Sequence, residues 1–169
     1  MIAGVDIGRS RDFTAIVTLD DLVITRADRL RLGQEWRAIV EGILHTTAGC
    51  SHIVVDATGV GSPIVEALQE KSSARVFPFL FTAASKPKLI GFLVSWFRDL
   101  SIHPACDAED LREELSRFSA QPTRKGWKFS GKGRGGKDDL VMALALSLMA
   151  RELRLRTLAR ARSVESIGH

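Results

Sequence analysis

Acidic side chains lie at the ends of three apolar segments that are far apart in the chain. Asp6 lies in an apolar run near the N-terminus, Asp56 ends a second run, and Asp138 with Asp139 opens a long third one. A lone carboxylate at the edge of an apolar segment is costly to bury unless it has a partner or a cation. We therefore expect these carboxylates to converge on a divalent-metal site, whose chemistry beside phosphate would be metal-assisted cleavage.

The surroundings of the first carboxylate favour a metal ligand. Gly4 and Gly8 share a strand face with Asp6, so they leave room for an ion or for a closely packed backbone. The alternative is a strand-end aspartate that caps a turn. Asp12 follows six residues later and is either an additional ligand, returned by a turn at residues 9–11, or a solvated turn residue.

The second carboxylate precedes a glycine-rich loop. Asp56 ends a strand that we expect in the centre of the sheet, and sites in open α/β sheets collect at the carboxyl ends of such strands. The following loop contains Thr58, Gly59 and Gly61, and its backbone N–H groups and the next helix start would attract phosphate. The pattern is common at helix starts and gains weight from its place after Asp56.

The third acidic pair opens a helix, where adjacent residues point about 100° apart. Asp139 is the preferred ligand, and Asp138 is either an N-cap or an auxiliary ligand. A triad of Asp6, Asp56 and Asp139 could hold two Mg²⁺ or Mn²⁺ ions about 3.5–4 Å apart. Such a site needs no His, Ser or Cys nucleophile, and we assign none of the four histidines to catalysis.

Basic side chains are concentrated late in the chain. Residues 119–169 have 11 Lys and Arg against 4 Asp and Glu, whereas residues 1–118 have 13 against 16. This asymmetry suits a polyanion lying across the acidic site, and a solvated surface with a basic tail explains it equally well. Contacts to the DNA backbone, which would be salt-sensitive and sequence-tolerant, are expected from Arg124, Lys125, Lys128, Lys132, Arg134 and Lys137, and less strongly from Lys86 and Lys88.

Hydrophobic periodicity predicts the elements that position these residues. Three strands, expected to pair as an antiparallel meander, cover residues 2–8, 13–19 and 22–32. Further strands are predicted at residues 52–56 and 75–81, a short hairpin around 124–126, and helices at 35–47, 62–71, 86–100, 108–118 and from 137 or 138 onward. This order predicts an α/β fold of the ribonuclease H-like type, a mixed sheet flanked by helices on both faces.

The length, the apolar runs and the cysteine content suggest one domain and an intracellular setting. We expect a domain over residues 1–156 and a basic, frayed or disordered tail over 157–169. No apolar run approaches the roughly 18 residues of a membrane span, and the N-terminus does not resemble a secretion signal. Cys50 and Cys106 stand alone, as is typical of a reducing cytoplasm.

Four segments together resemble a known family. Residues 4–8, 12–15, 54–61 and 137–145 are similar, in order and spacing, to the nuclease domain of large terminase subunits, the DNA-packaging motors of tailed bacteriophages. The resemblance implies a two-metal endonuclease that cuts concatemeric viral DNA in the host cytoplasm, with Mg²⁺ or Mn²⁺ on Asp6, Asp56 and Asp139 and assistance from Asp12 and Asp138. Its implied partners are double-stranded DNA, an ATPase domain, a small terminase subunit and a portal.

The chain departs from that family in one respect, and other functions remain open. It lacks the phosphate-loop motif GxxxxGKS/T and is too short for the ATPase, so we expect an isolated nuclease domain, a split gene product or a fragment. A Holliday-junction-resolvase-like nuclease of the same fold would use similar carboxylates. An actin-like or sugar-kinase-type nucleotide-binding domain would use residues 6–8 and 56–61 as phosphate loops, and an inactive DNA-binding scaffold would keep only the fold.

Overall fold

A six-stranded mixed sheet is the centre of the computed structural model, which describes residues 1–8, 13–31, 33–59, 61–123, 126–131 and 138–165. The strand order is β5-β4-β1-β2-β3-β6. The antiparallel meander is confirmed, and the remaining strands pair in parallel on either side of it. The strands are β1 (Ile2–Asp6), β2 (Ala15–Asp20), β3 (Val23–Arg29), β4 (His52–Asp56), β5 (Arg75–Phe79) and β6 (Ser101–Ile102).

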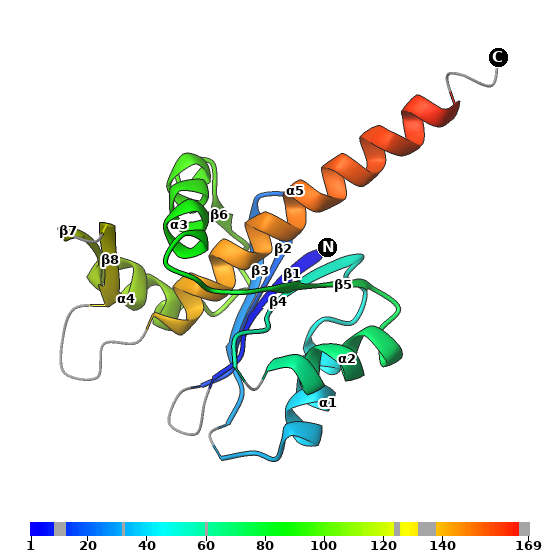
Figure 1. The fold of residues 1–169 in the computed structure, drawn as a ribbon, viewed down its shortest axis with the longest axis horizontal. Helices are drawn as coiled ribbons and strands as arrows, with labels where there is room; N and C mark the ends of the chain where they lie inside the picture. Colours follow the sequence, from blue (N-terminus) through cyan, green and yellow to red (C-terminus); the bar gives the residue numbers. More distant parts are fainter. Residues whose placement is uncertain (9–12, 32, 60, 124–125, 132–137, 166–169) are drawn as a thin grey trace.

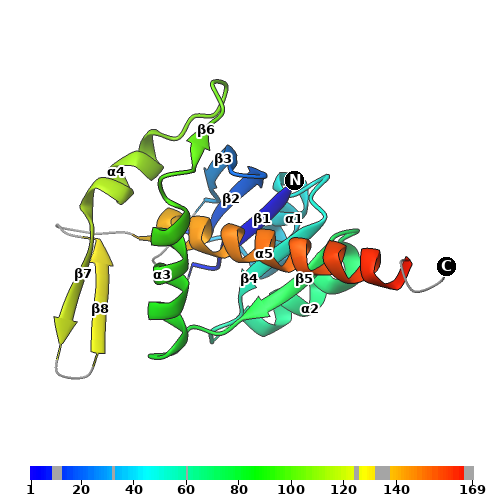
Figure 2. The ribbon, with the colours of Figure 1, turned by 90° about the horizontal axis from the view of Figure 1, so that it is seen from above.

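Helices cover both faces of this sheet, so the predicted α/β class is confirmed (Figure 1). One face is covered by α1 (Trp36–Thr46) and α2 (Gly61–Lys71). The other is covered by α3 (Ser85–Trp96), α4 (Glu109–Arg117) and α5 (Asp139–Glu165). A separate hairpin of β7 (Phe118–Thr123) and β8 (Gly126–Gly131) extends from the end of α4, away from the main sheet (Figure 2).

Side-chain alternation along the central strands produces two cores and assigns each carboxylate to a face. Ala3 and Val5 of β1 belong to the core under α1 and α2, whereas Ile2 belongs to the core under α5. In β4, Val54 likewise faces the α5 side. The last residues of β1 and β4, both aspartates, continue this alternation and therefore fall on the α5 face of the sheet.

Helix α5 packs directly on β1 at a glycine. A Cβ atom at Gly4 would lie 2.1 Å from the carbonyl oxygen of Ala143 and 2.2 Å from the backbone nitrogen of Ser147. The expectation that a glycine beside Asp6 allows close backbone approach is thus confirmed. The helix begins four residues before Ala143, so its first turn lies near the carboxyl end of β1.

Several element boundaries differ from the predictions. Strand β6, with only two residues, was missed, and α3 ends at Trp96 because the chain must turn to bring Ser101 beside β3. Phe118 begins β7 rather than closing a helix. Helix α5 continues past residue 156 to Glu165, so the proposed division there lies within a helix and stays a prediction. No helix among the described residues has the length and apolar character needed to cross a bilayer.

Candidate metal centre

Two aspartates lie at the carboxyl ends of adjacent parallel strands. The register between β1 and β4 pairs Gly4 with Val54 and Val5 with Val55. The next residue on each strand is an aspartate, Asp6 on β1 and Asp56 on β4. Neighbouring strands lie about 4.8 Å apart, so the two carboxylates leave the sheet close together and on the same face.

The start of α5 supplies two more carboxylates. Asp138 occupies the N-cap position, because its carbonyl oxygen accepts a 2.8 Å hydrogen bond from the backbone N–H of Met142. Its side-chain Oδ2 lies 3.4 Å from the Nζ atom of Lys86 on α3. Asp139 is the first residue of the helix proper. The acidic pair therefore stands at a helix N-terminus, where the helix dipole favours negative charge.

Electrostatic coupling shows that the four aspartates come together. The pKa of Asp6 is raised well above its usual value, first by burial and then by the charges of Asp56, Asp139 and Asp138, while Lys86 opposes the rise. Repulsion between like charges weakens with distance and is screened over about 10 Å, so these carboxylates lie in one region of the molecule. The convergence expected from the sequence is thus present in the fold.

The donor set suits a hard divalent cation, although the side chains do not form a complete ligand shell. Among the described residues, no group of three or more His, Cys, Asp or Glu side chains has the spacing of a finished metal site. All four converging groups are carboxylates, the ligands that Mg²⁺ and Mn²⁺ prefer. A cation among them would offset the repulsion that raises the pKa of Asp6. The residues present therefore fit such an ion.

The loop after β4 braces one of these carboxylates. The backbone N–H of Thr58 donates a 2.8 Å hydrogen bond to Oδ1 of Asp56, and the Thr58 hydroxyl accepts one of 2.8 Å from the N–H of Phe81. Gly59 has a φ of +74°, a conformation that favours glycine, so the turn there depends on it. The proposed proximity of Thr58, Gly59 and Gly61 to phosphate stays a prediction.

Most of the predicted DNA-binding residues lie outside the described part of the chain. This applies to Arg124, Lys125, Lys132, Arg134 and Lys137, and Asp12, predicted as an additional metal ligand, also lies outside it. Lys128 lies within β8. Lys86, a weaker candidate for phosphate contact, lies instead beside Asp138 and 5.9 Å from the centre of the Phe81 ring.

A buried glutamate that the sequence reasoning missed also contacts the start of α5. Glu114 on α4 is 5% exposed, and its Oε2 atom accepts hydrogen bonds from the backbone N–H groups of Leu140 and Val141. Its Oε1 atom pairs with Arg29 at the end of β3. One signal could have found it: Glu114 follows Leu111 by three residues, so it occupies a position on the apolar stripe of its helix.

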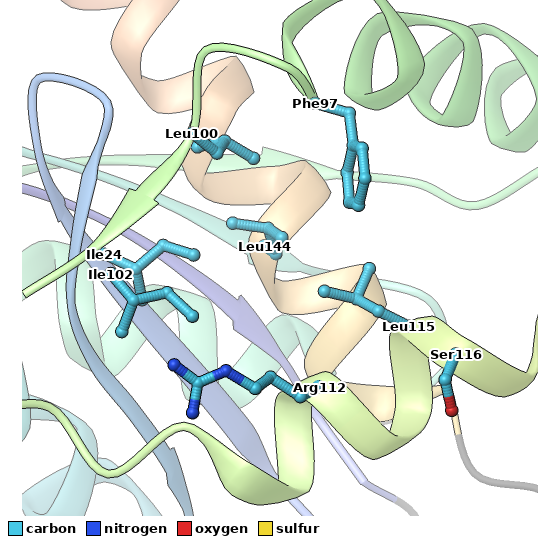
Figure 3. Close-up of a pocket in the computed structure, with 8 residues that line it drawn as sticks. All are labelled: Ile24, Phe97, Leu100, Ile102, Arg112, Leu115, Ser116 and Leu144. Atoms are coloured by element: carbon cyan, nitrogen blue, oxygen red, sulfur yellow. The ribbon is translucent and has the colours of Figure 1, made fainter.

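An apolar cavity lies apart from the four converging aspartates. It has a volume of about 430 Å³ and lies beside α5, between the end of α3, β6 and α4 (Figure 3). Its walls are apolar except for Arg112 and Ser116, and the other lining residues are Ile24, Phe97, Leu100, Ile102, Leu115 and Leu144. Without a carboxylate in its walls, this cavity offers no ligand for a hard cation.

Comparisons with known proteins give solved structures only. No protein-family model and no curated protein matches the chain. The large terminase nuclease from thermophilic phage G20c with bound magnesium is 26% identical, with a TM-score of 0.72 over 88% of this chain and 79% of that chain. The nuclease domain from Thermus phage P74-26 is 24% identical, with a TM-score of 0.66 over 86% and 76%. A large terminase fragment from bacteriophage Sf6 with calcium is 13% identical, with a TM-score of 0.68 over 87% of each chain.

These comparisons confirm the predicted resemblance. The structural neighbours of the chain are large terminase nuclease domains from several phages, and they match most of its length. The mixed sheet with helices on both faces is their ribonuclease H-like fold. The more distant phage proteins, at 12–14% identity, share that fold.

Proposed function

We propose that this chain, a structural neighbour of large terminase nuclease domains, is a divalent-metal-dependent nuclease that cleaves double-stranded DNA. The observation that supports the proposal is that Asp6 and Asp56 end adjacent parallel strands, while the charges of Asp56, Asp139 and Asp138 help to raise the pKa of Asp6. The G20c nuclease, 26% identical to this chain, has been solved with bound magnesium and with bound cobalt, which supports a metal-dependent reaction here.

In this proposal, Asp6, Asp56 and Asp139 hold two Mg²⁺ or Mn²⁺ ions, with Asp138 and Asp12 as auxiliary ligands. When bound, such ions would polarise the phosphodiester and lower the pKa of an attacking water. The chain's own contribution is to position the ligands, two from rigid strands and one from a helix end. Lys86, beside Asp138, offsets part of the negative charge that these carboxylates concentrate.

The biological role proposed is endonucleolytic cutting of concatemeric viral DNA during genome packaging. It rests on the resemblance to large terminases, and so do the proposed partners: an ATPase domain, a small terminase subunit and a portal. Backbone contacts to the duplex are assigned to the basic residues of the β7–β8 hairpin and the segment before α5. That segment directly precedes Asp138, so its basic residues are close in sequence to the acidic pair of Asp138 and Asp139.

The test is a digestion of supercoiled plasmid with Mn²⁺, with Mg²⁺ and with EDTA. We expect nicking that needs the metal and that falls by more than about 100-fold in Asp6→Asn, Asp56→Asn and Asp139→Asn, since each removes a ligand. Asp20→Asn is the matched control, because Asp20 is exposed at the opposite end of the meander. Full activity in any triad variant would remove that residue from the site.

The substrate and the ligand separate the remaining alternatives. Preferred cleavage of four-way junctions over linear duplex would favour the junction-resolvase-like function. Tight binding of a nucleotide by a chain that does not cut DNA would favour the kinase-like function. DNA binding without any metal-dependent cutting would identify an inactive scaffold.

A further inference from the structure

We infer that Glu114 is a positioning residue for the proposed metal centre, because it holds the first turn of α5 and thereby the Asp139 carboxylate. The inference rests on the proposed function, since it concerns how that centre is assembled. Glu114 does not belong to the carboxylate triad. Its effect would be transmitted through the backbone of the helix that carries Asp139.

The first contact of Glu114 satisfies the end of a helix. The first N–H groups of an α-helix have no partner within the helix and need an acceptor from elsewhere. Oε2 of Glu114 accepts hydrogen bonds of 2.8 Å from Leu140 N–H and 3.1 Å from Val141 N–H. The acceptor comes from 26 residues earlier in the chain, on α4, so it ties the helix end to a second element. A side-chain cap from Asp138 would have bonded the helix end only to the residue next to it in the chain.

The second contact of Glu114 fixes the carboxylate itself. Oε1 pairs with the guanidinium of Arg29 on β3, and the side chains are 6% and 20% exposed. Arg29 also pairs with the exposed Asp110 and lies 5.6 Å from the centre of the Phe13 ring. Both oxygens of Glu114 are therefore held, one by α5 and one by the sheet. The positive charge of Arg29 also balances the charge that Glu114 brings near the acidic cluster.

Geometry explains why this contact matters to Asp139. The packing of Ala143 and Ser147 on Gly4 sets how close α5 lies to β1. The contacts at Leu140 and Val141 set the rotation of its first turn. A helix with side chains has a radius of about 5–6 Å, so a roll of roughly 10° moves a side-chain tip by about 1 Å. A misplacement of about 1 Å at a reacting centre can cost about 100-fold in rate.

The experiment measures Mn²⁺ affinity on the full chain by titration calorimetry, with no DNA present. In Glu114→Gln the negative charge facing Arg29 is lost, and in Glu114→Asp the side chain is one methylene too short to reach both partners. We expect the Kd for Mn²⁺ to rise about tenfold or more in each, as is typical for groups that orient metal ligands. Asp110→Asn is the matched control: it removes the other carboxylate partner of Arg29, on the same helix, without touching α5, and should leave Kd within about twofold.

A second readout separates positioning from simple capping. Amide hydrogen exchange at Leu140 and Val141 should accelerate in Glu114→Gln, because the one neutral amide oxygen of glutamine is a weaker acceptor and cannot serve both Arg29 and the first turn of α5. Parent-like Mn²⁺ affinity in a folded Glu114→Gln chain would overturn the inference even if its melting temperature falls. If that variant does not fold, Glu114→Asp decides by the same criterion. If the parent chain takes up no Mn²⁺, the proposed function is overturned instead. Unchanged amide exchange in Glu114→Gln would then overturn the positioning role as well.

Discussion

The carboxyl group of Asp6 is ionised at a cost to the fold. Its pKa is raised well above the usual value by burial and then by Asp56, Asp139 and Asp138. An acid whose pKa is higher in the folded state favours folding when it is protonated. That contribution is lost as the pH rises from the unfolded pKa, about 3.9, through the folded one. Above the unfolded pKa, this raised pKa therefore lowers the stability of the folded chain.

Asp6→Asn should consequently stabilise the chain at neutral pH in EDTA. A gain of about 1 kcal/mol would raise the melting temperature by roughly 2–4 °C for a chain of this size. The advantage should shrink toward pH 4, where Asp6 is about half protonated in the unfolded state and largely protonated in the folded state. Thermal melts followed by circular dichroism at pH 4 and pH 7.5 check this, with Asp20→Asn as the exposed control. A variant less stable than the parent at pH 7.5 would show that burial does not penalise this charge.

Sequence reasoning found the four converging aspartates because each interrupts or ends an apolar segment. It did not find Glu114, because the partners of this residue are backbone N–H groups 26 and 27 residues later. A glutamate on a helix as charged as α4 also looks like part of a solvated face. Lys86 was predicted for phosphate contact, and its place beside Asp138 depends on how α3 packs against α5. Tertiary contacts of this kind leave little trace in local patterns.

At the scale of elements, the contact between α5 and β1 decides how the proposed centre is built. Gly4→Ala would place a methyl group 2.1 Å from the carbonyl oxygen of Ala143, so helix and strand must separate. We expect a loss of about 3 kcal/mol or more in unfolding free energy, at the upper end of overpacking. Weaker Mn²⁺ binding should accompany it, because Asp139 moves with the helix.

Gly91→Ala is the matched control for that substitution. Gly91 lies within α3, and a Cβ atom there would meet nothing within 4 Å. Alanine should therefore stabilise the helix by up to about 1 kcal/mol. Urea unfolding of both variants checks the pair. A Gly4→Ala chain as stable as the parent would mean that α5 does not pack tightly on β1.

Elements that arise from a local sequence pattern could be predicted, and elements that depend on tertiary contacts could not. Strand β4 was predicted at its observed bounds, because a short continuous apolar run between polar residues is typical of a buried strand. Strand β6 was missed, because two residues show no periodicity and pair with β3 only through tertiary contact. Phe97 falls within the helix predicted over residues 86–100, yet it is 50% exposed and lies past the end of α3.

At the scale of the whole molecule, the described basic residues after position 118 lie on two separate elements, β8 and α5. The hairpin and the C-terminal end of α5 lie on opposite sides of the molecule (Figures 1 and 2). Helix α5 has 27 residues, which corresponds to about 40 Å at 1.5 Å per residue. Its late arginines, such as Arg156 and Arg160, are therefore far from the acidic cluster at its start. Within the described residues, Lys128 of β8 and these late arginines therefore lie apart.

Two variants should consequently differ in DNA binding. Charge reversal of Lys125, Lys128 and Lys132 should weaken binding of a short duplex and lower its salt dependence by about 0.9 for each phosphate that the protein no longer neutralises. A chain ending at Arg156 should keep parent-like affinity for that duplex, and a parent-like melting temperature if residues 1–156 form the proposed domain. Fluorescence anisotropy against salt concentration measures the first effect. Equally weakened binding in both variants would mean that the distant arginines share the binding site.

The position of α5 in the chain has a consequence for biosynthesis. This helix covers one face of the sheet and carries the last of the converging aspartates, yet it is translated after everything that it packs against. A ribosome that has reached residue 138 holds a chain with one sheet face uncovered and the acidic centre incomplete. Any activity of the proposed metal centre would thus arise only together with a closed core.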